Sequence, residues 1–253
     1  MAELTMVSSL AGFNKGVQIH SLIWLLLCGV SCFGQDPELG RVERRGDRAT
    51  LVVDGPRPVD SAAKTLAWEF GIRVNVEDPG PGFPLSRGRS AVEFQLEPGG
   101  RPDDTPGLLR RIVEEANATL LVRYRLDAAD DWYSIIPMQT RDGSGKLVPV
   151  TPLLDRLITI PMGTRPVRES ADLMAKELSL QTGARVHCCQ AFVAGIPWGL
   201  PEVAFSASEE PARLVLKRLI VAAAGGRASG EHWLLRCDAS SPAWCFINLA
   251  HVR

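Results

Sequence analysis

The sequence predicts an α+β fold in which two tandem βαβ-βαββ modules, each with helices packed between small sheets, follow a signal peptide. Three observations lead to this prediction. Six short matches recur in one order, each copy alternates between strand and helix periodicity, and a short uncharged apolar run lies near the N-terminus. The predicted parts are a signal peptide at 1–34, a first module at 46–138, a connector at 139–155 and a second module at 156–253.

The repeat is recognised by its order and its spacing. All six matches have offsets of 107 to 112 residues. One short match would arise by chance, but six in the same order at nearly one offset indicate a tandem duplication. The leading residues of the matches are Arg57 and Arg165, Gly71 and Gly183, Val92 and Val203, Leu109 and Leu216, Arg125 and Arg236, and Trp132 and Trp244.

The elements of the first copy follow from the periodicity of its apolar residues. Residues 49–53 form an apolar strand, and Pro58 then begins a helix with its apolar positions on one face. Gly71 stands where a glycine ends a helix, and residues 72–76 alternate as in a half-buried strand. The remaining elements are a strand at 91–96, a helix that begins at Thr105-Pro106, and a hairpin of strands at 120–126 and 132–137.

The second copy repeats this order of elements. Its first helix is four residues longer than its counterpart, which is about one helical turn, so the buried face stays in register. Between the copies, Asp142-Gly143-Ser144-Gly145 is typical of a turn in a hairpin-like connector. The predicted elements are strands near 157–160, 184–189, 202–206, 232–237 and 244–250, and helices near 167–182 and 209–224, with Pro211 in the first turn of the second helix.

The N-terminal apolar run at 21–30 predicts export. It is too short to span a membrane and has the length of the apolar region of a signal peptide. Cys32-Phe33-Gly34 fits a cleavage site before Gln35, which would leave no transmembrane span and place the mature protein in the periplasm or at the envelope. A lipid anchor on Cys32 is one alternative, and a short buried helix or an uncleaved anchor is another.

Composition and motifs indicate a protein that is not an enzyme. The net charge of −1 gives no basic surplus, so nucleic acid is not an expected partner. The glycines around Ser229 lack the spacing of a nucleophile elbow. Gly143-Ser144-Gly145-Lys146 is followed by Leu147 rather than Ser or Thr, so a phosphate loop is not predicted either. No cofactor and no metal site are expected, and the histidines are interpreted as surface residues.

The C-terminal hairpin predicts a disulfide between Cys237 and Cys245. Antiparallel partners share a constant sum of residue numbers, and a buried face requires alternate residues to point the same way. The resulting pairs are Trp233 with Leu249, Leu235 with Ile247, and Cys237 with Cys245. Opposed residues lie within the range that a disulfide bridges, and an exported protein folds where disulfides persist. Two buried thiols are the alternative.

The other two cysteines of the predicted mature chain leave a second function open. Cys188 aligns with Val76 and is expected to be a thiol facing the core, while Cys189 aligns with Glu77 and is expected to face outward. A rival connectivity joins Cys188 to Cys237 or Cys245. The alternative function that rests on these residues is a thiol-redox or metal-binding periplasmic protein that uses Cys188, Cys189, Cys237 and Cys245.

Two further features concern the surface. The loop at 192–200 is apolar, and either it packs on its own core or it contacts a partner. Its candidate contact residues are Phe192, Ile196, Trp198 and Leu200. The charged pairs Arg125 with Asp127 and Arg236 with Asp238 are interpreted as solvated hairpin ends, because exposed ion pairs contribute little. Asn117-Ala118-Thr119 has the form of a glycosylation sequon.

Three segments of the two copies resemble a known family: Leu51-Val52-Val53-Asp54, the helix from Pro58 to Gly71 with the strand after it, and Glu210-Pro211-Ala212-Arg213 with its hairpin. In these segments each copy resembles the secretin and TonB short N-terminal domain. The resemblance implies a small envelope domain with helices between two sheets, which docks onto other proteins in secretion channels, transporters and transmembrane signalling, and it carries no catalytic residues. In a departure from that family, we expect no channel or β-barrel domain after the copies. We therefore expect an exported, non-enzymatic envelope protein that acts through contacts with envelope proteins of unknown identity.

Overall fold

The computed structural model describes residues 40–81, 83, 88–129, 132–188, 201–226, 231–238 and 243–251, and over these residues the fold is mixed α+β, as predicted. None of the helices in this part of the chain combines the length and the apolar character needed to cross a membrane. Several predictions fall on residues outside the described ranges, namely the signal peptide with Cys32, the thiol of Cys189, and the loop residues Phe192, Ile196, Trp198 and Leu200.

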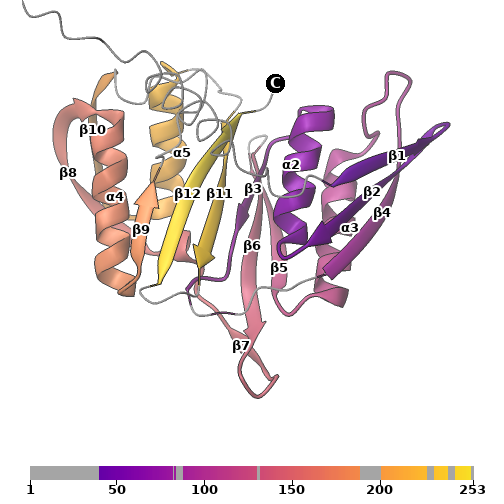
Figure 1. Ribbon diagram of the computed structural model, residues 1–253. Helices are drawn as coiled ribbons and strands as arrows, with labels where there is room; N and C mark the ends of the chain where they lie inside the picture. Colours follow the sequence, from indigo (N-terminus) through magenta and orange to yellow (C-terminus); the bar gives the residue numbers. More distant parts are fainter. Residues whose placement is uncertain are drawn as a thin grey trace, which may run out of the picture. The chain divides into compact units, whose positions relative to one another are not determined.

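From β2 onward the two halves of the chain have the same order of elements, and β1 has no counterpart in the described part of the second half (Figure 1). The first half consists of β1 (Arg41–Arg45), β2 (Arg48–Gly55), α2 (Pro58–Phe70), β3 (Val74–Glu77), β4 (Gly88–Gln95), α3 (Thr105–Thr119), β5 (Arg123–Ala129) and β6 (Trp132–Arg141). After the short strand β7 (Leu147–Pro149) and the 3₁₀ turn η1 (Leu153–Asp155), the second half consists of β8 (Leu157–Pro166), α4 (Val167–Thr182), β9 (Arg185–Cys188), β10 (Glu202–Pro211), α5 (Ala212–Ala223), β11 (Glu231–Asp238) and β12 (Trp244–His251).

The helix ends agree closely with the sequence signals. Gly71 and Gly183 end α2 and α4 with φ values of 69° and 71°, a left-handed conformation that glycine adopts without a steric penalty. The Asp104 side chain accepts the Gly107 N–H at 2.8 Å and so caps α3. The start of α5 was predicted too early. Pro211 precedes this helix, because β10 continues to Pro211 in antiparallel pairing with β8.

The strands form two small sheets and one long sheet. The small sheets have the orders β1-β2-β4 and β10-β8, and the long sheet has the order β5-β6-β3-β11-β12-β9, with β7 beside β6. The long sheet runs through both halves, because β3 pairs in parallel with β11 in the register Val76 with Leu234 and Glu77 with Leu235 (Figure 1). The sequence did not predict that the halves share a sheet.

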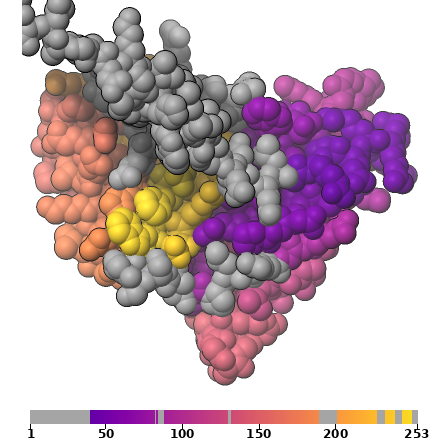
Figure 2. All heavy atoms as spheres, viewed as in Figure 1, coloured from indigo at the N-terminus to yellow at the C-terminus, as the bar shows by residue number. Residues whose placement is uncertain are grey.

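The long sheet carries the two cores on opposite faces. Val74 and Val76 of β3 and Leu234 of β11 belong to the core beneath α2 and α3. Trp233 and Leu235 point to the other face and belong to the core beneath α4 and α5. In the space-filling view, the first half, indigo to magenta, abuts the yellow C-terminal strands (Figure 2).

β3 is therefore buried on both faces, and the prediction that it is half-buried was wrong. Its polar side chains, Asn75 and Glu77, are 2% and 0% exposed. The cause is the second core, which extends across the long sheet beyond β3 as far as Trp132 of β6. A strand covered on both faces by different halves cannot be recognised from alternation alone.

Candidate functional site

A network of polar side chains joins the two halves of the described chain where β3 meets β11. We call this region the seam and define it as β3 with the following Asp78, β11, and the side chains that join them. Its main-chain pairing is extended by side chains. The Asp78 N–H donates to the Leu235 carbonyl oxygen at 2.9 Å, and the Trp233 N–H donates to Asn75 Oδ1 at 3.0 Å. Asn75 Nδ2 donates to the Tyr133 carbonyl oxygen at 3.0 Å, so one buried amide connects three strands of the sheet.

On the α5 side of the sheet, the seam is closed by a buried ion pair. Arg213 of α5 donates to Glu77 Oε1 through Nη2 at 2.7 Å and through Nε at 2.9 Å. Arg213 also pairs with Asp155 of η1, which lies 3.6 Å from Arg125 of β5. Four charges from four elements thus form one network.

Burial dominates the electrostatics of Glu77. Its side chain is fully buried, and this burial raises the pKa of Glu77 to about 7, although Arg213 favours the ionised form and works against the shift. Asp155, also an acid, adds to the rise, and the Trp233 side chain opposes it. Glu77 Oε2 and Trp233 Nε1 nevertheless have no well-formed hydrogen bond within the described part of the chain.

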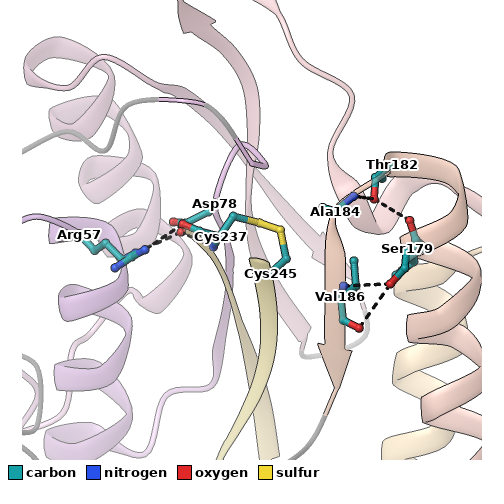
Figure 3. The surroundings of a disulfide bond; sticks show 9 residues. Arg57, Asp78, Ser179, Thr182, Ala184, Val186, Cys237 and Cys245 are labelled. Carbon is teal, nitrogen blue, oxygen red and sulfur yellow. Dashed lines mark hydrogen bonds and ion pairs between the residues drawn. A yellow bond between two sulfur atoms is a disulfide. The ribbon is translucent and has the colours of Figure 1, made fainter. Parts of the chain in front are cut away.

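On the α2 side of the sheet, a second group of charged side chains bonds to β11. Asp78 Oδ2 accepts the Cys237 N–H at 2.9 Å, and Arg57 bonds both Asp78 and the Cys237 carbonyl oxygen, each at 3.1 Å (Figure 3). Burial raises the pKa of Asp78 as well, against the opposing effect of Arg57. Asp60 of α2 pairs with Arg236 of β11.

The interpretation of Arg236 as a solvated hairpin residue was therefore wrong. Its side chain is only 24% exposed and reaches across the seam to Asp60, because β11 is an inner strand of the long sheet and not a free hairpin edge. Its counterpart in the first half, Arg125, is 48% exposed, in keeping with the position of β5 at the sheet's end. Asp127 and Asp238 are exposed.

The predicted hairpin register is confirmed in full. Trp233 pairs with Leu249, Leu235 with Ile247, and Cys237 with Cys245, and all six side chains are buried. Cys237 and Cys245 form a disulfide of 2.03 Å, which lies next to Asp78 and Arg57 (Figure 3). The rival pairing of Cys188 with either residue is excluded. Cys188 is buried on β9 as expected, but it is a disulfide cysteine and not a free thiol, and its partner is outside the described residues.

This disulfide is placed as a structural staple. Its two residues are 4% and 0% exposed, and thiol exchange requires access to a sulfur. We expect a Cys237→Ala/Cys245→Ala variant to lose about 2–3 kcal/mol of unfolding free energy, because the bond closes a short loop in the unfolded chain. Urea titration of both proteins without reductant measures this loss. Unchanged midpoints would show that the bond does not constrain the unfolded chain.

Two of the histidines, His187 and His232, are less exposed than predicted. His232 is 1% exposed, and His187 stacks on Trp244 and Phe246 with ring centroids 5.0 and 5.5 Å apart. Over the residues that the structure describes, three or more His, Cys, Asp or Glu side chains nowhere gather in a way that would hold a metal ion.

The residues that build the seam were not among the predicted site residues. Asn75 and Glu77 alternate with apolar residues, as the solvent-facing residues of a half-buried strand do. Arg213 looks like an ordinary polar residue in the first turn of a helix. One signal was present: the first copy has Asn75 and Glu77 where the second has His187 and Cys189. Differences between aligned copies at strand positions mark places where the two halves meet different surroundings.

The comparisons with known proteins do not extend these observations. No protein-family model matches the chain, and no curated protein or solved structure is significantly similar to it.

One strand edge outside the long sheet differs from the others. β8 pairs on one side with β10, and within the described residues no strand lies on its other side. Leu157 and Met162 of β8 are 54% and 72% exposed. The segment 157–163 carries no charge, whereas four of the five residues of the edge strand β1 are charged. Edge strands are usually protected by charges, so β8 is unusually open to pairing.

Proposed function

We propose that the chain is an exported, non-enzymatic envelope protein that docks onto other envelope proteins by accepting a partner strand at β8. Its two halves are interpreted as duplicated modules similar to the secretin and TonB short N-terminal domain. The shared order of elements and the helix-ending glycines at matching positions support this interpretation. The module boundaries, the signal peptide and the envelope location remain predictions.

The observation that carries the proposal is that equivalent strand edges of the two halves differ: the edge is paired in the first half and unpaired in the described part of the second. In the first half, β1 lies antiparallel beside β2, in the register Arg41 with Val52 to Arg45 with Arg48. β8 takes the place of β2 in the second half, because both strands precede the first helix of their half and pair with the strand that precedes its second helix, β4 for β2 and β10 for β8. The edge that β1 covers on β2 is unpaired on β8 within the described residues.

The open main-chain groups and exposed apolar side chains of β8 indicate what kind of partner strand it would accept. An added strand gains main-chain hydrogen bonds, and its side chains contact those of the strand it joins. Gln181 Nε2 already donates to the Leu157 carbonyl oxygen at 2.8 Å, and Pro161 has no N–H, so the open stretch is 158–160. The exposed apolar side chains on either side of this stretch favour an extended partner segment with apolar residues and little charge.

Site-directed photo-crosslinking in intact cells tests this function. A photoreactive residue at Met162 is expected to capture a partner in the envelope, whereas one at Leu180 of α4, which is 73% exposed, is not. Lysines at Leu157 and Met162 are expected to abolish capture by a probe elsewhere on β8 without affecting the fold, since both side chains are exposed. Equal capture at both positions, or capture that survives the lysines, would argue against docking at β8.

A further inference from the structure

The β5 edge of the long sheet is closed by a side chain. Asn117 of α3 behaves like one peptide unit of a missing neighbour strand: its Oδ1 accepts the Tyr124 N–H at 2.7 Å, and its Nδ2 donates to the Tyr124 carbonyl oxygen at 2.9 Å. Asn117 Nδ2, the atom of the sequon that would carry a glycan, is therefore already engaged in a main-chain hydrogen bond.

The β9 edge, at the other end of the sheet, is closed in the same manner. Ser179 Oγ of α4 accepts the Val186 N–H at 2.9 Å, and Thr182 Oγ1 accepts the Ala184 N–H at 3.3 Å (Figure 3). The Ser179 hydroxyl is held in place because it donates to the Ala175 carbonyl oxygen at 2.7 Å. Both outer edges thus have main-chain groups bonded to side chains of the adjacent helix.

The same positions at the seam carry alanine. With the offsets of the repeat, Asn117 corresponds to Ala224 and Ser179 corresponds to Ala67. At the seam, the main-chain groups bond to the opposite strand instead: Leu235, the counterpart of Tyr124, accepts the Asp78 N–H. Among the described strands, the capping side chains are therefore present at the two edges without a neighbour strand and absent at the two edges that pair.

The geometry points to a second copy of this chain as the partner that these side chains exclude. β5 is the counterpart of β11, and β9 is the counterpart of β3. The pairing that joins the two halves would consequently join β9 of one copy to β5 of the next. Such a contact uses two different edges of each copy. One β5 edge and one β9 edge stay unpaired at the two ends of the assembly, so further copies could add to form an open-ended oligomer. We infer that Asn117 and Ser179 terminate the sheet and keep the protein from assembling through the interface that joins its own halves.

The charges at the outer edges act in the same direction. At the seam, Asp60 pairs with Arg236. Their counterparts at the outer edges are Arg168 and Arg125, both positive, so pairing of β9 with β5 would bring like charges together where the seam has an ion pair. Assembly is therefore expected to be weak even when the capping side chains are removed, and to be strengthened by salt.

Two single variants test the inference with a dimer instead of an open-ended oligomer, because each variant opens one edge only. Asn117→Ala opens only β5 and Ser179→Ala opens only β9, and each gives the edge the residue that the seam carries. Each variant alone is expected to remain a monomer in sedimentation velocity, and the 1:1 mixture is expected to show a twofold increase in molar mass with rising concentration. Thr119→Ala, which removes a hydroxyl that bonds only within α3, is the matched control and is expected to form no dimer with either variant.

Hydrogen exchange separates opened edges from misfolding. In dilute solution, the Tyr124 amide should exchange faster in Asn117→Ala and the Val186 amide faster in Ser179→Ala, with the two cores still protected. Mixing at high concentration should restore the protection of both amides. The inference is overturned if both edges open and the mixture remains monomeric at high concentration and high salt, or if the wild-type protein assembles as readily as the mixture.

Discussion

Replacing Arg213 with methionine is expected to lower the unfolding free energy by about 3–5 kcal/mol at pH 8, because the buried Glu77 carboxylate loses its cation. Methionine retains most of the apolar stem, so lost packing adds little to the effect. At pH 5 the loss should be smaller, because Glu77, with a pKa of about 7, is already protonated in the folded wild-type protein and leaves no buried charge when Arg213 is removed. Denaturant titrations at the two pH values measure both quantities.

Lys217→Met supplies the control for this experiment. Lys217 lies one helical turn beyond Arg213 on α5, and its ammonium group is 5.3 Å from the centre of the Trp132 ring. An interaction of this kind contributes about 0.5–2 kcal/mol. If Arg213→Met costs no more than Lys217→Met, or if its cost does not change with pH, Glu77 does not depend on Arg213 and the account of the seam is wrong.

The second large effect is a loss of stability as the pH rises through neutrality. Glu77 has a pKa of about 7 in the folded chain and 4.5 as its ordinary value, so the folded state binds more protons between these values. Unfolding is then favoured as protons are removed. Relative to Glu77→Gln, the wild-type protein is expected to lose about 3 kcal/mol between pH 4.5 and pH 7.5. The raised pKa of Asp78 acts in the same direction in both proteins and cancels in the comparison.

A pH series of urea titrations on the two proteins decides the matter. Curves of unfolding free energy that run parallel from pH 4.5 to 7.5 would mean that the carboxyl of Glu77 is not perturbed in the folded state. A wild-type curve that rises relative to Glu77→Gln would mean that the attraction of Arg213 outweighs burial.

The features that the sequence predicted well are those set by local geometry. Gly71 and Gly183 end their helices at the expected residues, because a left-handed backbone is a property of that residue alone. The register of Cys237 with Cys245 could be derived from alternation and a short connection. Both require information from only a few neighbouring residues.

The seam could not be predicted in the same manner, since β3 and β11 are separated by more than 150 residues of chain. Periodicity assigns Asn75 and Glu77 to a solvent face, and only the second core shows that this face is covered. The substitution of Ala67 by Ser179 and of Asn117 by Ala224 between the copies did hold information. These differences between the copies can be interpreted only when the position of each strand edge in the sheet is known.

The pairing of β3 with β11 makes one sheet of the two halves, and the seam exists only if these strands pair. A NOESY spectrum of the oxidised protein tests this pairing directly. We expect main-chain contacts between Val76 and Leu234 and between Glu77 and Leu235, as the parallel register requires. A spectrum that shows the internal pairing of β11 with β12 and of β3 with β6 but no contact between β3 and β11 would contradict this pairing.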